Sequence, residues 1–173
     1  MLAVFAFSLS AAPVQEEKKP GEKKYTSEEG NFAIQYPAGM KVSTREGKQS
    51  NFILKMTKAE SNTKRYSVSY MELPQSALAN KAATMFDLIE QPIVNSKEAK
   101  ILNRSDIVFG KEKFPAREMV VEVGGMFART QIIHAGPKIY MVGVFGSKDF
   151  ATGKEADEFF KSFEILTPPK TDK

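Results

Sequence analysis

The sequence predicts an α+β fold in which a central antiparallel β-sheet, arranged as a meander, is flanked by helices on both faces. Three observations lead to this prediction. Several segments place apolar residues at every second position, which is typical of β-strands. Two other segments repeat apolar residues at helical spacing. The last long strand is apolar on both of its faces, so it needs cover on both sides and a position near the centre of the sheet.

The composition is that of one compact domain with few reactive side chains. Of the 173 residues, 42% are hydrophobic and 27% are charged. The chain has no Cys and one His, which excludes disulfides, zinc fingers, iron–sulfur clusters, thiol nucleophiles and sites that need two imidazoles. The net charge of +4 arises from lysines interleaved with glutamates rather than from one basic cluster. We therefore expect no cofactor, no metal ion and no nucleic-acid partner.

The first fifteen residues carry no charged side chain. The apolar run Leu2–Leu9 and the small residues after it are typical of a signal-peptide core and cleavage zone, and the run is too short to span a bilayer. The basic residues that usually precede such a core are missing, which indicates either an incomplete signal peptide or a start site placed too late. We expect a protein exported to the periplasm or the extracellular space, without an integral membrane span; the alternative is a cytosolic protein with an apolar first strand. The predicted organisation is a signal-peptide remnant (1–12), a flexible linker (13–24), a single domain (25–167) and a tail (168–173).

Three segments in the first half of the domain have strand periodicity. Phe32, Ile34 and Tyr36 occupy alternate positions before Pro37, which predicts a half-buried strand that ends in a turn. The same alternation recurs at Phe52, Leu54 and Met56 and at Tyr66, Val68 and Tyr70.

A change to helical periodicity follows these strands. It predicts an amphipathic helix over Ser76–Gln91 that ends before Pro92. The apolar face of this helix comprises Leu78, Ala82, Phe86 and Ile89.

Two tight turns predict the meander. Gly124 and Gly125 accept the positive φ angles of a two-residue hairpin turn, which sets the register of the strands on either side. In that register Val123 faces Met126, Val121 faces Ala128 and Met119 faces Thr130. The opposite face pairs Glu122 with Phe127 and Glu118 with Gln131, and it leaves Arg129 diagonal to both glutamates.

The second turn, Ala135–Lys138, returns the chain along Ile139–Phe145. A four-residue loop there would pair this last strand with His134 back to Ala128. Its side chains are apolar in both directions, with Tyr140, Val142 and Val144 on one face and Ile139, Met141 and Phe145 on the other.

A second helix and a short strand close the domain. Thr152 and Glu155 have the spacing of a capping box, which predicts that the helix begins at Thr152. A short final strand or docking segment is expected from Phe163 to Leu166. The apolar stripe of this helix comprises Ala156, Phe159, Phe160 and Phe163.

Four residues are candidates for a surface site, and none belongs to a catalytic motif. His134 lies at a strand end, where it could act as a base or bind a ligand, or simply hydrogen-bond to backbone or water. Glu118, Glu122 and Arg129 form a charge cluster that reads either as cross-strand surface pairing or as a weak cation site. We therefore expect no catalytic, cofactor-binding or metal-binding residues.

Four segments of the chain resemble the PsbP-like superfamily, in particular its small exported bacterial members. Those members open with the pattern GF-x-V-x-x-P and close with F-x-x-SF. The resemblance implies a central antiparallel sheet flanked by helices, and no established enzymatic activity. Superfamily members are accessory proteins, such as the extrinsic subunit of the oxygen-evolving complex and a nuclear-transport factor that binds a small GTPase, but no contact residue can be transferred from them. The segments are Tyr25–Pro37, Gly110–Glu118, Arg129–Tyr140 and Ala156–Phe163.

These observations favour an exported, non-catalytic accessory or binding protein that acts through protein–protein contacts with an unknown partner. The alternative is a carrier of a small apolar ligand or lipid in a cavity between sheet and helix, built from some of the 8 Met and 13 Phe residues. A third reading, an enzyme, would require His134 or a buried carboxylate in a cleft.

Overall fold

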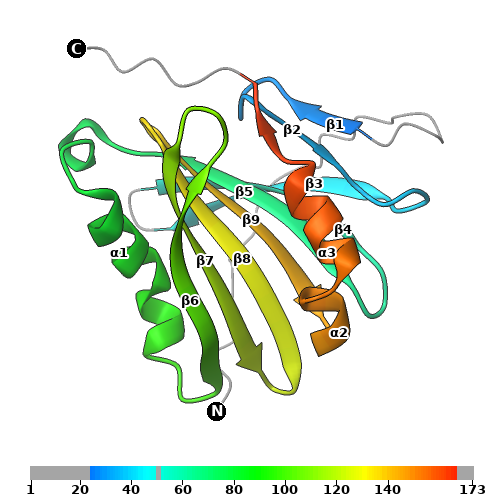
Figure 1. The fold of residues 1–173 in the computed structure, drawn as a ribbon. Helices are drawn as coiled ribbons and strands as arrows, with labels where there is room; N and C mark the ends of the chain where they lie inside the picture. Colours follow the sequence, from blue (N-terminus) through cyan, green and yellow to red (C-terminus); the bar gives the residue numbers. More distant parts are fainter. Residues whose placement is uncertain (1–23, 50–51, 167–173) are drawn as a thin grey trace.

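Two antiparallel sheets carry the fold in the computed structural model, which describes residues 24–49 and 52–166 (Figure 1). The large sheet has seven strands in the order β3-β4-β5-β9-β8-β7-β6 and the small one has three in the order β1-β2-β10. The strands of the large sheet are β3 (Val42–Gln49), β4 (Phe52–Glu60), β5 (Arg65–Glu72), β6 (Ala99–Phe109), β7 (Phe114–Val123), β8 (Met126–Ala135) and β9 (Lys138–Gly146). The small sheet consists of β1 (Lys24–Ser27), β2 (Phe32–Gln35) and β10 (Glu164–Ile165).

The predicted meander is confirmed. Strands β6 to β9 are neighbours in chain order, and β9 takes the central place among the seven strands of the large sheet. Tyr140 and Val142 on one face and Ile139 on the other are fully buried. An apolar strand needs this central place because only there do neighbours cover both of its faces.

The predicted register of both hairpins is also confirmed. Gly124 and Gly125 have φ angles of 58° and 78°, and Val123 pairs with Met126 across them. At the second turn Ala135 pairs with Lys138, so the loop has two residues rather than four, but the strands keep the expected alignment. The remaining predicted pairs are Val121 with Ala128, Met119 with Thr130, Glu118 with Gln131, Glu122 with Phe127, and His134 with Ile139.

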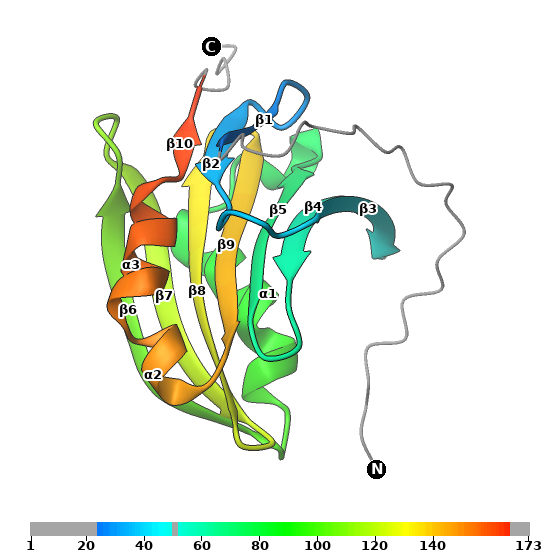
Figure 2. The same cartoon turned by 90° about the vertical axis from the view of Figure 1, so that its right-hand side faces the viewer.

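Strand β2 is more deeply buried than the predicted half-buried strand. Ala33, on the face expected to be exposed, has no accessible surface, because β2 lies between β1 and β10. Two tyrosine hydroxyls connect this region to the large sheet: that of Tyr36 donates to the carbonyl of Thr57 at 2.8 Å, and that of Tyr140 donates to the carbonyl of Gly30 at 2.8 Å. Figure 2 shows the small sheet near one end of the large one.

The two edge strands of the large sheet had no clear sequence signal. Strand β3 reads VSTREGKQ and β6 contains Lys100, Arg104 and Asp106, so neither alternates cleanly between apolar and polar residues. A register shift between Ile101 and Asn103 further interrupts β6. Charges and bulges are common devices that keep edge strands from pairing with other chains.

The first helix begins later and ends later than predicted. Residues Gln75–Ala77 form a 3-10 turn, η1, and α1 spans Ala82–Val94 with Pro92 inside its last turn. Leu78 therefore lies outside the helix and is 38% exposed. Pro92 removes one backbone hydrogen bond near the end of a helix, and α1 continues for only two residues beyond it.

The predicted capping box at Thr152 is wrong. A separate short helix, α2 (Lys148–Ala151), precedes α3 (Lys154–Lys161), and the Thr152 hydroxyl donates to the Lys148 carbonyl inside α2 at 2.9 Å. Glu155 cannot cap the helix because its carboxylate accepts hydrogen bonds from Lys64 and Tyr66. The predicted apolar stripe is confirmed, since Ala156, Phe159, Phe160 and Phe163 are all buried.

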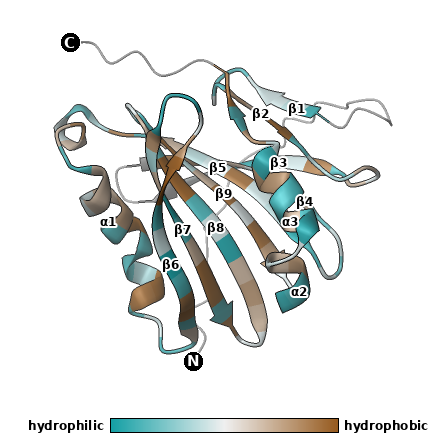
Figure 3. Cartoon of the chain, in the orientation of Figure 1, coloured by the Kyte–Doolittle hydropathy of each residue, from teal (hydrophilic) through white to brown (hydrophobic). Residues whose placement is uncertain are grey.

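The buried side chains form two clusters that meet at β9. Tyr140 and Val142 belong to the larger cluster, together with residues of α2, α3 and the small sheet, whereas Ile139 belongs to the smaller cluster with Met85 and Phe86 of α1. Figure 3 shows hydrophobic residues along the central strands and mostly hydrophilic ones on the side of α3 turned to the viewer. Within residues 24–49 and 52–166, no helix is both long and apolar enough to cross a membrane.

Several predictions for the chain ends fall outside the described residues. These are the signal-peptide remnant (1–12), most of the linker (13–23) and the tail (168–173). Lys24, the last residue of the predicted linker, is the first residue of β1.

Candidate protein-binding face

Two of the four predicted site residues, Glu118 and Arg129, meet beneath α3. Their atoms Oε2 and Nη2 lie 3.0 Å apart, and Gln131 donates to the same carboxylate oxygen at 2.8 Å. The second arm of Arg129 pairs with Asp157 of α3 at 2.6 Å, and the guanidinium lies 4.9 Å from the centre of the Phe160 ring. This cluster therefore attaches α3 to β7 and β8.

Glu122 does not join this cluster. It lies in register with Phe127 and Lys100, and it forms no ion pair with any residue that the structure describes. Its expected place is taken by Asp157, which sequence analysis missed because the register of a hairpin does not indicate where a distant helix packs. Glu118 and Glu122 therefore do not share a partner, and the described residues contain no group of three His, Asp or Glu side chains that could hold a metal ion.

His134 is partly buried and lacks a catalytic partner in the described part of the chain. Its Nε2 atom is buried without a hydrogen-bond partner, and burial lowers the pKa of the imidazole from its ordinary value of 6.5 despite a hydrogen bond with the backbone of Gly136. The ring is therefore neutral at pH 7. A neutral histidine with no neighbouring nucleophile or carboxylate does not form a catalytic pair.

A second charge cluster, which sequence analysis missed entirely, attaches α1 to β6 and β7. Arg117 donates from Nε to Asp106 at 2.6 Å and from Nη1 to Asp87 at 2.6 Å and Glu90 at 3.3 Å. Arg104 lies 2.6 Å from the same Asp87 oxygen and 2.8 Å from Glu90. Asp106 and Arg117 are direct cross-strand partners. This pairing could have been predicted only if residues 99–109 had been recognised as a strand.

This charge cluster lines a shallow pocket of about 390 Å³ together with Ser105. Hydrogen bonds from Arg117 hold the pKa values of Asp87 and Asp106 below their ordinary range. Glu90 is fully buried, and its Oε1 atom has no partner among the described residues. Two arginines already occupy most of the carboxylate oxygens, so the cluster positions α1 rather than offering free acid–base groups.

Another pocket of about 390 Å³ lies beside the turn between β1 and β2. Glu29 accepts hydrogen bonds there from Lys55, and its backbone carbonyl accepts one from Lys138 at 2.6 Å. Lys138 is only 6% exposed and lies 5.6 Å from the centre of the Tyr70 ring. The pocket therefore mixes charged and apolar side chains.

One part of the large sheet beyond α1 has no described helix packed mainly on it. Cross-strand pairing aligns Met56, Ser69 and Met141 in one row, and Lys58, Ser67 and Gly143 in the next. Phe145 occupies the third row, opposite Arg65. We call the surface formed by Met56, Ser67, Ser69, Met141, Gly143 and Phe145 the open face; Ser69 and Gly143 are buried within it, and the other four residues are partly exposed.

No described helix packs mainly on the β4 and β5 part of the open face. Helix α1 contacts β6 and β7, whereas α2 and α3 contact β8 and β9. The side chains that contact α2 and α3 belong to the larger cluster and alternate along β9 with those of the open face. Met56 and Phe145 are partly exposed and belong to neither buried cluster of the described residues, and Met141 lies at the border of the smaller one.

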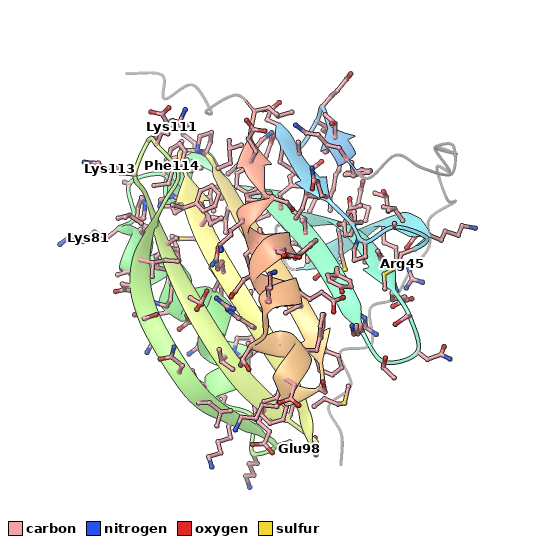
Figure 4. The ribbon with its side chains drawn as sticks, turned by 45° about the vertical axis from the view of Figure 1, so that its right-hand side comes forward. Arg45, Lys81, Glu98, Lys111, Lys113 and Phe114 are labelled. Carbon is pink, nitrogen blue, oxygen red and sulfur yellow. The ribbon has the colours of Figure 1, made fainter. Side chains whose placement is uncertain are left out.

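Basic side chains border the open face on the β3 side. Arg45, in register with Met56, is exposed and forms no ion pair within the described ranges. Lys58 and Arg65 share Glu60, at 2.7 and 3.2 Å. The Arg65 guanidinium also lies 5.7 Å from the centre of the Phe145 ring. Figure 4 labels Arg45 at this edge and Lys111 and Lys113 at the turn between β6 and β7.

Comparison with known proteins shows similarity at the level of the fold. No protein-family model and no curated protein sequence matches the chain. The solution structure of cyanobacterial PsbP (CyanoP) from Synechocystis sp. PCC 6803 is similar, with a TM-score of 0.59 and 13% identity over 88% of this chain and 98% of that one. The crystal structure of PA94 from Pseudomonas aeruginosa, a protein of unknown function, gives a TM-score of 0.49 and 15% identity over 86% and 97% of the two chains. The similarity to CyanoP confirms the predicted PsbP-like fold.

Proposed function

We propose that this protein, with its PsbP-like fold, is an exported and non-catalytic binding protein that acts through contact with another protein. The open face carries this proposal. It exposes part of two methionines and a phenylalanine on a rigid sheet, and adaptable Met and aromatic side chains are enriched where proteins bind one another. A sheet face of this kind is normally covered by another layer of secondary structure. The described part of the chain supplies no such layer over β4 and β5, so a partner protein would supply it.

A non-catalytic role is supported by the way the titratable groups are used. The clusters around Arg117 and Arg129 connect helices to the sheet, and His134 is neutral with Nε2 unpartnered. Export is supported by the uncharged first fifteen residues and the apolar run Leu2–Leu9. Cell fractionation of the full chain in its organism of origin, followed by mass determination of the product, tests export and cleavage together.

Cross-linking in the organism of origin tests the partner. A photo-reactive amino acid replaces Met56 or Phe145 in the full chain, and matched variants carry it at Lys111 or Glu98. We expect a discrete protein adduct from position 56 or 145 after illumination. The absence of an adduct at all four positions, with the protein folded and correctly localised, would contradict a role in protein binding.

A second candidate function is carriage of a small ligand. The feature that favours it is the pocket lined by Tyr70, Leu73 and Ile53, which is large enough for a small molecule. Glu29, Lys55 and Glu72 also line this pocket, which favours a polar ligand over a lipid. Mass spectrometry of aqueous and organic extracts from the purified chain would detect a polar ligand or a lipid that co-purifies in stoichiometric amount.

We also infer that helices flank both faces of the large sheet, although unequally. Support comes from β9, whose alternate residues belong to the cluster with α2 and α3 and to the cluster with α1. On the face of the smaller cluster, α1 contacts β6 and β7 and leaves the β4 and β5 part without a helix among the described elements. This inequality is what makes the open face available to a partner.

A further inference from the structure

We propose that the open face binds an amphipathic helix of a partner protein whose apolar stripe is flanked by acidic residues. This inference deepens the proposed function, on which it rests, by stating the form and charge of the bound segment. Three features of the open face support it: its width, its relief and the charges along its border.

The width of the open face suits one helix. It extends over β4, β5 and β9, because α1 packs on β6 and β7. Three neighbouring strands cover about 10 Å, which is about the diameter of an α-helix with its side chains. A helix there would lie beside α1 and complete a second helical layer, as sheets with one partly covered face require. A bound strand would instead need the free backbone of an edge strand, which the open face does not contain.

The relief of the open face permits close approach where its middle row crosses β5 and β9. Ser67, Gly143 and Thr130 are cross-strand partners with small side chains, and a Cβ atom on Gly143 would lie only 3.2 Å from the Thr130 hydroxyl. On β4 the same row holds Lys58, which is buried and pairs with Glu60. The larger Met56 and Met141 lie on one side of this row and Phe145 on the other. The methionine row and the Phe145 row are four residues apart, which is about 14 Å along a strand. Apolar side chains of a helix that lies along the strands can therefore pack between these two rows.

The charges along the border select an acidic partner. Arg45 of β3 and Arg65 of β5 contribute two exposed cations on this side of the sheet, whereas Lys58 of β4 is buried and shares the carboxylate of Glu60 with Arg65. Arg45 has no counter-ion in the described chain, so a partner carboxylate would gain an ion pair without displacing an existing one. Complementary charge of this kind raises association rates and excludes basic partners. An anionic membrane or nucleic acid fits less well, because the largest side chains of the face, Met56, Met141 and Phe145, are apolar and its cations are few.

A designed peptide probes this surface directly. The probe is an 18-residue helical peptide with leucines on one stripe and glutamates beside it; the matched control carries lysines in place of the glutamates. Titration of the isotope-labelled full chain, followed by NMR, reports which amides respond, and calorimetry gives the affinity. We expect the acidic peptide to shift the amides of Met56, Ser67, Met141, Gly143 and Phe145, and we expect no saturable binding of the basic peptide.

Matched charge reversals test the border. Arg45→Glu removes an exposed cation without breaking an ion pair of the described chain, and we expect it to weaken acidic-peptide binding about five- to tenfold. Lys111→Glu makes the same change at the turn between β6 and β7 and should leave binding unchanged (Figure 4). Met56→Ser replaces an apolar side chain of the open face with a small polar one. Circular dichroism and thermal unfolding of each variant establish that it is folded.

Several outcomes would overturn the proposal. These include peptide-induced shifts confined to other surfaces, equal binding of the two peptides, or equal effects of the two charge reversals. Shifts at the open face that depend on protein concentration would assign it to a second copy, and shifts there on deletion of residues 2–12 would assign it to the chain's own amino-terminal segment. Cross-links to a protein only from Lys111 or Glu98 would refute the open face yet leave the binding function supported.

Discussion

Arg117 is the residue on which the position of α1 depends most. Its side chain is 7% exposed, and its guanidinium contacts Asp106, Asp87 and the fully buried Glu90. Replacing it would leave Glu90 buried with Arg104 as its remaining ionic partner. We expect Arg117→Met to lower the free energy of unfolding by about 3–5 kcal/mol, measured by urea denaturation.

The double variant Arg117→Met/Glu90→Leu is the control for this prediction. An apolar pair of similar volume often replaces a buried ion pair without net loss, so most of the stability should return. If the double variant is as unstable as the single one, packing rather than an unpaired charge accounts for the loss.

His134 gives the protein a pH dependence near neutrality. Because burial lowers the pKa of the folded imidazole below 6.5, the unfolded chain takes up a proton first as the pH falls. The free energy of unfolding should therefore decrease as the pH falls from 6.5 through the lower folded pKa. Unfolding curves of the protein and of His134→Leu over this range check the prediction, since the variant should lack this decrease.

Carboxylates provide an internal reference at lower pH. Asp87 and Asp106 have lowered pKa values because Arg117 hydrogen-bonds to them, so they stabilise the fold above their ordinary value of 3.8 and lose this effect as acid protonates them. Both the protein and His134→Leu should show this second decrease. A histidine variant that retains the full decrease near pH 6 would contradict the assignment.

At the residue scale, the sequence was informative only where a turn determined the pairing. The two glycines at 124 and 125 place Glu118 two positions from Arg129 across one strand pair, and this pair does form. Asp157 and Glu90 reach their partners through helix docking, which depends on packing of surfaces distant in the chain. Met56 and Phe145 looked like core residues, because alternation indicates a face but not whether anything covers it.

At the element scale, Ser147 rather than Thr152 is expected to stabilise the region of the last two helices. The Ser147 hydroxyl accepts a hydrogen bond from the Phe150 backbone at the start of α2, whereas that of Thr152 bonds within α2. Ser147→Ala should lower the free energy of unfolding by about 1 kcal/mol, and Thr152→Ala by less. Chemical denaturation of both variants compares them; a larger loss for Thr152→Ala would restore the predicted capping box.

Elements with a clear apolar pattern in their own residues were predictable, and elements held in place by their neighbours were not. The stripe of α3 and the strand β9 are strongly apolar, and β5 alternates apolar residues with polar ones; each forms where it was expected. Edge strands β3 and β6 are polar and are held in place by their neighbours, so their own residues carry little signal. The start of α1 depends on the turn at Pro74, which competes with the helical pattern for residues 75–80.

At the scale of the whole molecule, the two sheets should unfold as one unit. The Phe32 ring of the small sheet lies 5.9 Å from the ring of Tyr70, 6.3 Å from that of Tyr140 and 5.7 Å from that of Phe163. Phe32→Ala should lower the stability of the entire domain by about 3–5 kcal/mol, with equal effects on slowly exchanging amides of β2 and β9. Hydrogen exchange measures both sheets in one experiment.

Val108→Ala is the matched control for the cooperative unfolding. Its side chain is 71% exposed, so the substitution should change stability by less than about 0.5 kcal/mol. Faster exchange confined to β1 and β2 in Phe32→Ala would indicate that the small sheet opens independently. The central place of β9 was predictable because this strand is apolar in both directions, whereas the separate sheet β1-β2-β10 was not predicted.

The central position of β9 has a consequence for the chain before it folds. Ile139–Phe145 is an uncharged stretch without proline, and such segments of high β-propensity associate readily with copies of themselves. Its partner β5 ends at Glu72, so the pairing that protects this stretch closes a long loop and forms late. Until β5 and β8 enclose it, the strand that organises the native sheet is also the segment most prone to aggregation, and refolding yield should fall steeply as protein concentration rises.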